Sequence, residues 1–308
     1  MKKKLIIHGG MHKTGTSSIQ FSLNANKALL QQNGITFPEE GLARDKEVGF
    51  RHLYISNMLK KHAFNADTFL EVVHSLLEYD AHTIILTHED FFRKDIHPQG
   101  IALLDEYFEI SLVVYVKDPV RYFNDKYKEW VRRQNCTLEA GEFILSHLDY
   151  LHWHQILPIW EKVIGRSNIF MNALSGDDLI GEFYGLVNSI AHSNVNIDEL
   201  LQVKRANTSL SNSQILLMLI NNRAKPKLPS HLFNTAGGIT NDTGLVLSHE
   251  CVRQIKAKSW HALHYLKTKY GLNIEIPPVD QYVIDEKFSD IQTRAQALNV
   301  LRSLASEV

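Results

Sequence analysis

A short segment near the amino terminus combines residue types suited to binding a phosphate group. Residues 10–18 read Gly-Met-His-Lys-Thr-Gly-Thr-Ser-Ser and follow the apolar run Leu5–Ile7 closely. A glycine-containing loop that opens a helix presents unbonded backbone N–H groups and the positive end of the helix dipole to an anion. The residues that we expect to surround the anion are His12, Lys13, Thr14, Gly15, Thr16, Ser17 and Ser18.

The position of the lysine argues against a nucleoside triphosphate. The ATP- and GTP-binding pattern is Gly-x-x-x-x-Gly-Lys-[Ser/Thr], and Thr16 stands where that lysine would be, with Lys13 three residues upstream. Because the lysine of that pattern reaches the outer phosphates, its displacement predicts a different anion. The alternative is a capped helix start that binds nothing, in which Thr14, Thr16 or Ser17 serves the first amides.

A second polar segment, Thr87-His88-Glu89-Asp90, follows an apolar run that is typical of a buried strand. Histidine and carboxylate groups can both remove a proton from an attacking hydroxyl. Adjacent residues on an extended segment point to opposite sides, so only one of His88 and Glu89 is expected to face the site. The sequence leaves the choice open, and it also leaves open a structural His88 beside a Glu89-Asp90 helix cap.

Alternating strands and helices are predicted to position these groups. Strand patterns are followed by stretches with helical periodicity, which predicts a mostly parallel sheet of five strands flanked by helices, of the P-loop nucleotide-binding type. The carboxyl ends of such strands form nucleotide sites. The predicted strands lie at 5–7, 34–37, 84–87, 112–116 and 168–171, and the predicted helices at 17–30, 66–78, 101–107 and 122–133.

Strand signals fade after about residue 174. Helical patterns occupy 177–189, 211–222 and 249–270, and the interval 225–245 is rich in turn-forming residues and predicts a long loop. We therefore expect an α/β core over residues 1–175 and a helical extension over residues 176–308, packed on the core as one unit.

Composition excludes several classes of partner. Thirty-three basic residues balance thirty-four acidic ones, so no global field draws the chain to nucleic acid or an anionic membrane. Only Cys136 and Cys251 are present, which favours a reducing compartment over a disulfide framework. No metal-ligand spacing is recognisable, and the apolar run near the amino terminus is too short to span a membrane. A cytoplasmic protein without a metal is expected.

The phosphate loop resembles the 5′-phosphosulfate loop of sulfotransferases that use 3′-phosphoadenosine 5′-phosphosulfate (PAPS). It is most similar to bacterial sulfotransferase-like proteins, in which the segment reads Gly-Met-His-Lys-Thr-Gly-Thr-Thr-Ser-Ile-Gln, against residues 10–20 here. Segments 84–91, 150–165 and 207–210 resemble later family motifs in the same order. The resemblance implies sulfate transfer from PAPS to a hydroxyl, with 3′,5′-adenosine bisphosphate as product. The acceptor that it implies is a carbohydrate or a glycolipid.

The resemblance also implies roles for single residues. Lys13 would stabilise charge that grows on the bridging oxygen as the sulfur–oxygen bond breaks. The base would be His88 by comparison with cytosolic sulfotransferases and Glu89 by comparison with the bacterial proteins. The 3′-phosphate motif of the family places an arginine where Lys117 stands and a serine where Asp125 stands. Lysine lacks the bidentate fork and aspartate repels phosphate, although Arg121 is placed to compensate.

Two other functions fit parts of the sequence. A phosphotransferase with a rearranged loop would need magnesium and a strand-end aspartate, for which Asp90 is the candidate. A nucleotide-binding protein without catalysis is compatible with the departures at Lys117 and Asp125.

Overall fold

The computed structural model describes residues 2–11, 13–45, 49–174, 178–202, 210–225, 227–233 and 238–306. The chain forms two compact units. Unit 1 contains residues 1–117, 153–207 and 265–273, and unit 2 contains residues 118–152, 208–264 and 274–308. Each unit is assembled from three separated stretches, whereas the sequence analysis expected two contiguous segments. The chain leaves the sheet at residue 118 and returns to it with the helix that starts at Trp153.

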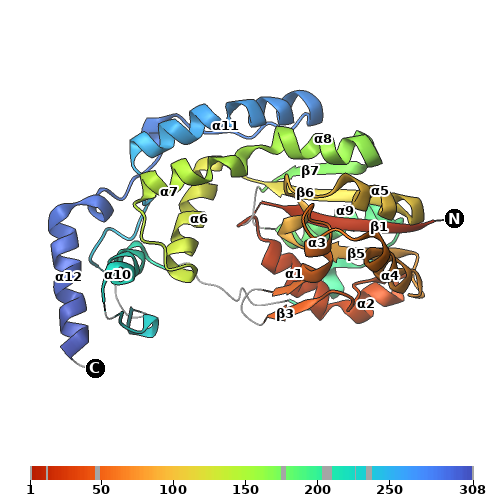
Figure 1. The fold of residues 1–308 in the computed structure, drawn as a ribbon, viewed down its shortest axis with the longest axis horizontal. Coiled ribbons are helices and arrows are strands. Elements are labelled where there is room, and N and C mark those ends of the chain that lie inside the picture. The colour runs from red at the N-terminus through yellow and green to blue at the C-terminus, as the bar shows by residue number, and fades with distance from the viewer. Residues whose placement is uncertain are drawn as a thin grey trace. The chain divides into compact units, whose positions relative to one another are not determined.

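Unit 1 is built on a five-stranded sheet in which every neighbouring pair of strands is parallel (Figure 1). This confirms the predicted fold class. The central strand β1 (Lys3–Gly10) lies between β5 (Thr83–Thr87) and β6 (Phe108–Val116), with β2 (Ile35–Thr36) and β7 (Ile169–Ala173) at the edges. All five predicted strands are present. β6 begins four residues earlier than predicted, where buried and exposed side chains alternate.

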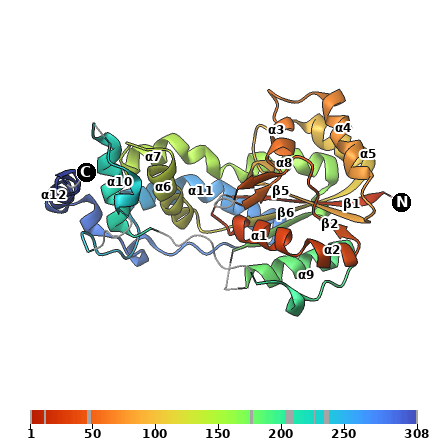
Figure 2. The ribbon, with the colours of Figure 1, turned by 90° about the horizontal axis from the view of Figure 1, so that it is seen from below.

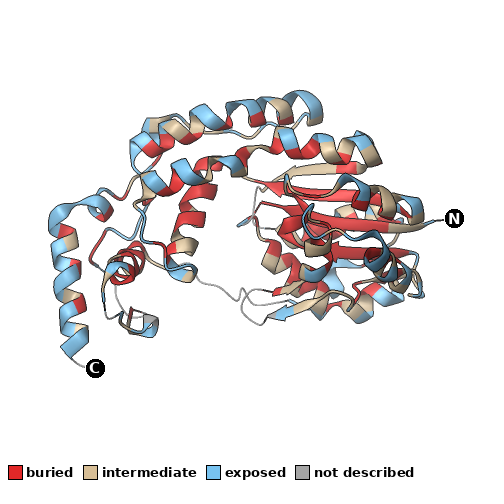
Figure 3. Cartoon of the chain, viewed as in Figure 1, coloured by how far each residue is buried: buried red, intermediate tan, exposed pale blue. Residues whose placement is uncertain are grey.

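Helices cover both faces of this sheet (Figure 2). α1 (Thr16–Ala25) and α9 (Leu179–Ala191) lie on one face, and α4 (Ala66–Leu77), α5 (Pro98–Tyr107) and α8 (Trp153–Ile164) lie on the other. The three central strands β5, β1 and β6 are largely buried (Figure 3). The core on the α1 side consists mainly of Ile6, Ile19, Leu23, Ile85, Val113, Phe183 and Val187.

One predicted helix is interrupted. Residues 17–30 form α1 and α2 (Lys27–Gln32), which are separated at Asn26. The Asn26 side chain donates to the Ser22 carbonyl at 2.8 Å and accepts from the Leu201 N–H at 2.8 Å. The break therefore follows from a side-chain contact with a distant segment.

Shorter elements of unit 1 connect the layers. β3 (Ala43–Asp45) and β4 (Gly49–Arg51) pair in antiparallel fashion, and α3 (Leu53–Met58) follows β4. The 3₁₀ helices of this unit are η1 (Glu89–Phe91), η3 (Arg166–Asn168) and η4 (Ile197–Glu199). Of these elements, α3 and η1 contribute to the candidate site described below.

Three lysines before and within β1 lie at the carboxyl ends of three helices. The Lys2 ammonium donates to the Asp105 carbonyl near the end of α5, and Lys3 donates to the Leu77 carbonyl at the end of α4 at 2.8 Å. Lys4 donates to the carbonyl of residue 190 near the end of α9 at 2.7 Å. The last carbonyls of a helix lack partners and carry partial negative charge, so an ammonium group stabilises them. The basic amino-terminal run therefore supports the fold.

Unit 2 is helical. It contains α6 (Pro119–Arg133), α7 (Ala140–His147), α10 (Asn212–Arg223), α12 (Ile291–Ser306) and residues 249–264 of α11 (His249–Tyr270). Its 3₁₀ helices are η2 (Leu148–Leu151), η5 (Ser230–Phe233), η6 (Val279–Gln281) and η7 (Glu286–Ser289). Within the predicted loop 225–245, the described residues form η5 and, at Leu245, an isolated β-bridge with Ile284. Among the helices that the structure describes, none has the length and apolar character to cross a membrane.

Unit 2 is organised around the buried helix α10 (Figure 3). The Asn222 side chain donates to the carbonyls of Val131 and Cys136, which satisfies backbone groups at the end of α6. Glu139 forms ion pairs with Arg223 and Arg294, each at 2.8 Å. The hydrogen bond from Arg294 is the main cause that lowers the pKa of Glu139 to about 2.

Candidate functional site

The predicted phosphate loop connects the end of β1 to the start of α1. The Met11 N–H donates to the Tyr115 carbonyl at 3.4 Å, which ties the loop to the neighbouring strand β6. Lys13 and Gly15 have φ angles of 67° and 80°, so the backbone turns through the left-handed region at both positions. His12, which the sequence predicted as a loop contact, lies outside the described residues.

The amino end of α1 has a glycine at its cap position. Gly15, the N-cap residue, makes no side-chain hydrogen bond, and the first turn has no acidic residue. The Thr14 hydroxyl donates back to the Met11 carbonyl at 2.7 Å instead. The first amides of a helix lack partners within the helix, so this end retains its attraction for an anion. The alternative, a capped helix start that binds nothing, stays a hypothesis.

Thr16 adds a buried polar atom to the same helix end. The residue is 2% exposed, and within the described part of the chain its Oγ1 has no hydrogen-bond partner. Buried hydroxyl groups in native structures nearly always have a partner, so such an atom calls for an explanation. An anion at the start of α1 would accept this hydrogen bond. Ser17 and Ser18 follow on the same first turn, and both are partly exposed.

We expect Gly15→Ala to destabilise the protein by about 1–3 kcal/mol, because a non-glycine residue is strained at this φ. The added Cβ would also lie 2.1 Å from Cδ2 of Leu179. Gly185→Ala is a matched control, because it adds a methyl group to α9 with nothing within 4 Å. Alanine favours a helix over glycine by about 0.8–1 kcal/mol, so the control should stabilise. Urea unfolding measures both changes, and a destabilisation shared equally by both variants would contradict the strain at Gly15.

The second predicted segment lies beside the loop at the same edge of the sheet. β1 and β5 are adjacent and parallel, and His8 pairs with Thr87 in register. The ladder continues for one step, because the His88 N–H donates to the His8 carbonyl at 3.0 Å. η1 then begins, and its first free amide, from Asp90, donates to Nδ1 of His88 at 3.2 Å. The His88 side chain, rather than a carboxylate, therefore caps this turn.

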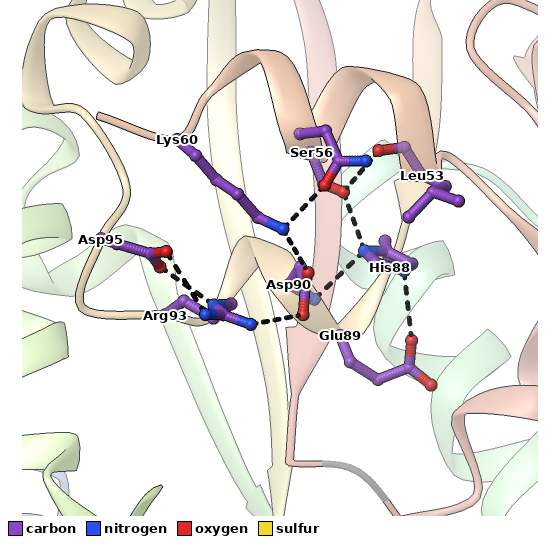
Figure 4. A network of polar contacts seen from close by, with 9 residues as sticks. Leu53, Ser56, Lys60, His88, Glu89, Asp90, Arg93 and Asp95 are labelled. Atoms are coloured by element: carbon purple, nitrogen blue, oxygen red, sulfur yellow. Dashed lines mark hydrogen bonds and ion pairs between the residues drawn. The ribbon is translucent and has the colours of Figure 1, made fainter. Parts of the chain in front are cut away.

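His88 is contacted at both of its ring nitrogens (Figure 4). It is 3% exposed, and its Nδ1 lies 2.8 Å from the Ser56 hydroxyl as well as accepting from the Asp90 amide. Because Nδ1 accepts, the neutral ring carries its proton on Nε2. That Nε2 lies 3.8 Å from Oε2 of Glu89. The ring therefore lies with its proton-bearing nitrogen toward the neighbouring carboxylate.

Glu89 and Asp90 have different surroundings. The Asp90 carboxylate binds the Lys60 ammonium at 2.7 Å and the Arg93 guanidinium at 3.5 Å. Burial opposes ionisation of Asp90, but the Lys60 hydrogen bond and the surrounding positive charges outweigh it and lower its pKa to about 2. Glu89 is 8% exposed, and its Oε2 has no hydrogen-bond partner among the residues that the structure describes. Of the two carboxylates, Glu89 retains an oxygen with capacity to accept a proton.

A buried histidine, His8, lies at the carboxyl end of β1, next to Thr87. His8 is fully buried, and its Nδ1 lies 2.8 Å from the Thr87 hydroxyl. Burial lowers the pKa of His8 to about 4, so the ring is neutral at pH 7. It also packs against the rings of Tyr115 and Phe183. This histidine supports the end of β1 and was not recognised from the sequence.

The residues of the predicted 3′-phosphate motif follow β6. Lys117 is half-buried and ends a segment of unit 1, whereas Arg121 and Asp125 lie on α6 in unit 2. Asp118 caps α6 by accepting from the Val120 N–H at 2.8 Å. Arg121 lies 3.7 Å from Asp118, with 70% of its side chain exposed. Its predicted contact with a 3′-phosphate stays a prediction, as do those of Lys117 and Asp125.

The structure adds three residues that sequence reasoning missed. His52, Ser56 and Lys60 contact residues Thr87, His88 and Asp90, respectively. Only Ser56 of the three lies within α3, so their spacing of four residues did not by itself mark a shared helix face. Across the described ranges, no three histidine, cysteine or acidic side chains gather closely enough to hold a metal ion.

Comparisons with known proteins add little to this geometry. No protein-family model matches the chain, and no curated protein matches it. Among solved structures, a sulfotransferase from Alicyclobacillus acidocaldarius aligns with a TM-score of 0.40 and 11% sequence identity. The alignment covers 72% of this chain and 93% of that one. With a likeness of this size, the case for function rests on the residues of the loop and the strand end.

Proposed function

We propose that this protein is a sulfotransferase that moves a sulfuryl group from PAPS to a hydroxyl of a carbohydrate or glycolipid acceptor. The observation that carries the proposal is the start of α1, where the buried Thr16 hydroxyl has no partner among the described residues. This anion site has Thr16 where ATP-binding loops have lysine. The resemblance of the loop to sulfotransferases supports the same donor.

The loop residues suit the 5′-phosphosulfate end of PAPS. The hydroxyls of Thr16, Ser17 and Ser18, together with backbone amides between Thr14 and Ser17, would hold the 5′-phosphate. When bound, PAPS supplies the sulfuryl group that is transferred. Lys13, which is exposed at the loop, would lie near the oxygen that bridges phosphorus and sulfur. His12 would contact the same group, and the proposal includes no metal ion.

The segment Thr87–Asp90, at the end of β5, suits a reaction with the acceptor hydroxyl. Glu89 would take the proton of the acceptor hydroxyl as its oxygen attacks sulfur in line. The bond between sulfur and the bridging oxygen then breaks, which leaves a sulfated acceptor and 3′,5′-adenosine bisphosphate. Negative charge grows on the departing oxygen, where the Lys13 ammonium would stabilise it. We assign the base to Glu89 rather than His88 because Nδ1 of His88 is already bonded to Ser56 and Asp90.

The remaining roles follow from the resemblance. Lys117 would supply positive charge to the 3′-phosphate of PAPS, with Arg121 as a second cation and Asp125 as an unfavourable neighbour. A cytoplasmic location also stays a prediction. A magnesium-dependent phosphotransferase is less well supported, because Asp90 already binds Lys60 and Arg93.

Ligand-induced thermal stabilisation tests the proposal. At a hundredfold excess over its dissociation constant, a ligand stabilises by about 2.7 kcal/mol. For a chain of this size, that corresponds to a rise in Tm of roughly 4 °C. We expect adenosine bisphosphate and adenosine 5′-phosphosulfate to raise Tm, and ATP with magnesium to raise it less. Transfer of labelled sulfate from PAPS to glycan hydroxyls is then assayed.

The results of these two measurements distinguish between the three candidate functions. Stabilisation by adenosine bisphosphate together with sulfate transfer supports the proposal. Stabilisation only by ATP with magnesium would overturn it in favour of a phosphotransferase. Stabilisation by adenosine bisphosphate without transfer to any hydroxyl acceptor would indicate a nucleotide-binding protein.

A further inference from the structure

Helix α3 and its two flanks carry three residues spaced four apart that contact the end of β5. His52 is the N-cap residue of α3, Ser56 lies within the helix, and Lys60 follows its end. Residues four apart on a helix share a face. We call this set the α3 stripe, and its partners are Thr87, His88 and Asp90.

His52 takes the place of a neighbouring strand. β2 pairs with β5 only at Thr83 and residue 84, so the edge of β5 at Thr87 needs another partner. The His52 N–H donates to the Thr87 carbonyl at 2.8 Å, and the Thr87 N–H donates to Nδ1 of His52 at 3.0 Å. Nε2 of His52 lies 3.1 Å from the Pro38 carbonyl. Both backbone groups of Thr87 are therefore fixed by one residue, whose neutral ring is favoured because burial lowers its pKa to about 3.

Ser56 and Lys60 fix the next side chains along the segment (Figure 4). The Ser56 hydroxyl lies 2.8 Å from Nδ1 of His88 and 2.9 Å from the Leu53 carbonyl, and its single proton can be donated to only one of these acceptors. The Lys60 ammonium binds Asp90 at 2.7 Å. Of the four residues from Thr87 to Asp90, the stripe contacts every one except Glu89.

We propose that His52, Ser56 and Lys60 are positioning residues, which fix Thr87, His88 and Asp90 and thereby hold the Glu89 carboxylate in one orientation. This inference rests on the proposed function, in which Glu89 is the base. A general base works only within hydrogen-bond reach of the proton that it removes. Sites of this kind require side chains locked by surrounding packing and hydrogen bonds. The stripe supplies that support from α3 and the residues that flank it.

Ser56→Ala tests the central contact of the stripe. We expect it to lower kcat for sulfate transfer by about 10-fold, with the KM for PAPS changed less than about twofold, because misplacement of a catalytic group by less than 1 Å has effects of this order. Ser56→Thr keeps the hydroxyl, so its kcat should lie between those of Ser56→Ala and the wild type. Tyr54→Ala is the matched control, because Tyr54 lies on the same helix with 60% of its surface exposed. Equal kcat values for Ser56→Ala and Tyr54→Ala would overturn the proposal.

Lys60 provides a second, milder pair of variants in case Ser56→Ala does not fold. Lys60→Arg retains the ion pair with Asp90 and should keep kcat near the wild-type value, whereas Lys60→Met should lower it several-fold. Melting temperatures are measured for every variant, so that a loss of kcat in a folded protein is separated from unfolding. Equal kcat values for Lys60→Arg and Lys60→Met would contradict the proposed positioning role of the α3 stripe.

A readout independent of sulfate transfer separates this inference from the proposed function. Nitrogen-15 NMR of the His88 ring reports whether Nδ1 accepts a hydrogen bond. We expect Ser56→Ala to shift the His88 Nδ1 resonance and Tyr54→Ala to leave it in place. If the wild-type protein transfers no sulfate, the proposed function fails while this spectrum still tests the His88 contact. An unshifted His88 resonance in Ser56→Ala would overturn the proposed positioning role of the α3 stripe, whether or not the protein transfers sulfate.

Discussion

Replacing Lys13 with alanine is expected to lower kcat for sulfate transfer by about 10²–10³-fold, because removal of one group that stabilises transition-state charge has effects of this size. Lys13 occupies a left-handed backbone position at the tip of the loop, and its side chain is exposed at the edge where β1 and β5 end. A fixed ammonium at the bridging oxygen acts mainly as the sulfur–oxygen bond breaks. Affinity for adenosine bisphosphate should therefore change less than about fivefold.

The experiment compares turnover with nucleotide affinity in the same variants. Steady-state kinetics gives kcat, and thermal titration with adenosine bisphosphate gives the dissociation constant. Lys61→Ala, at an exposed lysine after α3, is the control for the loss of one positive charge. Lys13→Ala turnover within twofold of the wild type would remove Lys13 from the mechanism. A parallel loss of affinity and turnover would make Lys13 a binding residue only.

Glu89→Gln is expected to reduce kcat by about 10²-fold or more, because an amide of the same shape cannot take the acceptor proton. The Oε2 atom that changes is buried and lacks a hydrogen-bond partner within the described residues, so few structural contacts are lost. His88→Ala should lose less turnover and more stability. It removes an acceptor that Ser56 and the Asp90 amide both use, which costs about 1–3 kcal/mol when a buried partner is left unpaired.

Kinetics and urea unfolding together distinguish the two residues. Glu109→Gln serves as a control, because Glu109 is exposed on β6. A larger kcat loss in His88→Ala than in Glu89→Gln would assign the base to His88. Mild losses of equal size in both would place the base outside this segment.

The strands were predictable because buried parallel strands are continuous apolar runs, as at Ile84–Thr87 and Leu112–Val116. The break between α1 and α2 was not, because it depends on a bond between Asn26 and Leu201 that no local pattern encodes. The β3–β4 pair was also missed. Its strands have three residues each, which is too short for a clear alternation.

The candidate site was predictable in its parts and not in its choice of base. Gly10–Ser18 and Thr87–Asp90 were recognised from residue types at predicted strand ends. The proposed choice of Glu89 over His88 rests in part on the Ser56 hydroxyl, which lies 32 residues earlier in the chain than His88. A polar residue such as Ser56 at helical spacing usually faces solvent, so sequence alone gave no reason to place it beside His88.

The lysines at the start of β1 have an electrostatic consequence for donor capture. Lys2, Lys3 and Lys4 offset the partial negative charge at the carboxyl ends of α5, α4 and α9. The amino end of α1 has no acidic residue in its first turn, so no carboxylate of that turn offsets its partial positive charge. A chain with a formal net charge of −1 can thus keep a positive potential where PAPS would arrive. Capture of that polyanion should slow as ionic strength rises, even though the protein as a whole is nearly neutral.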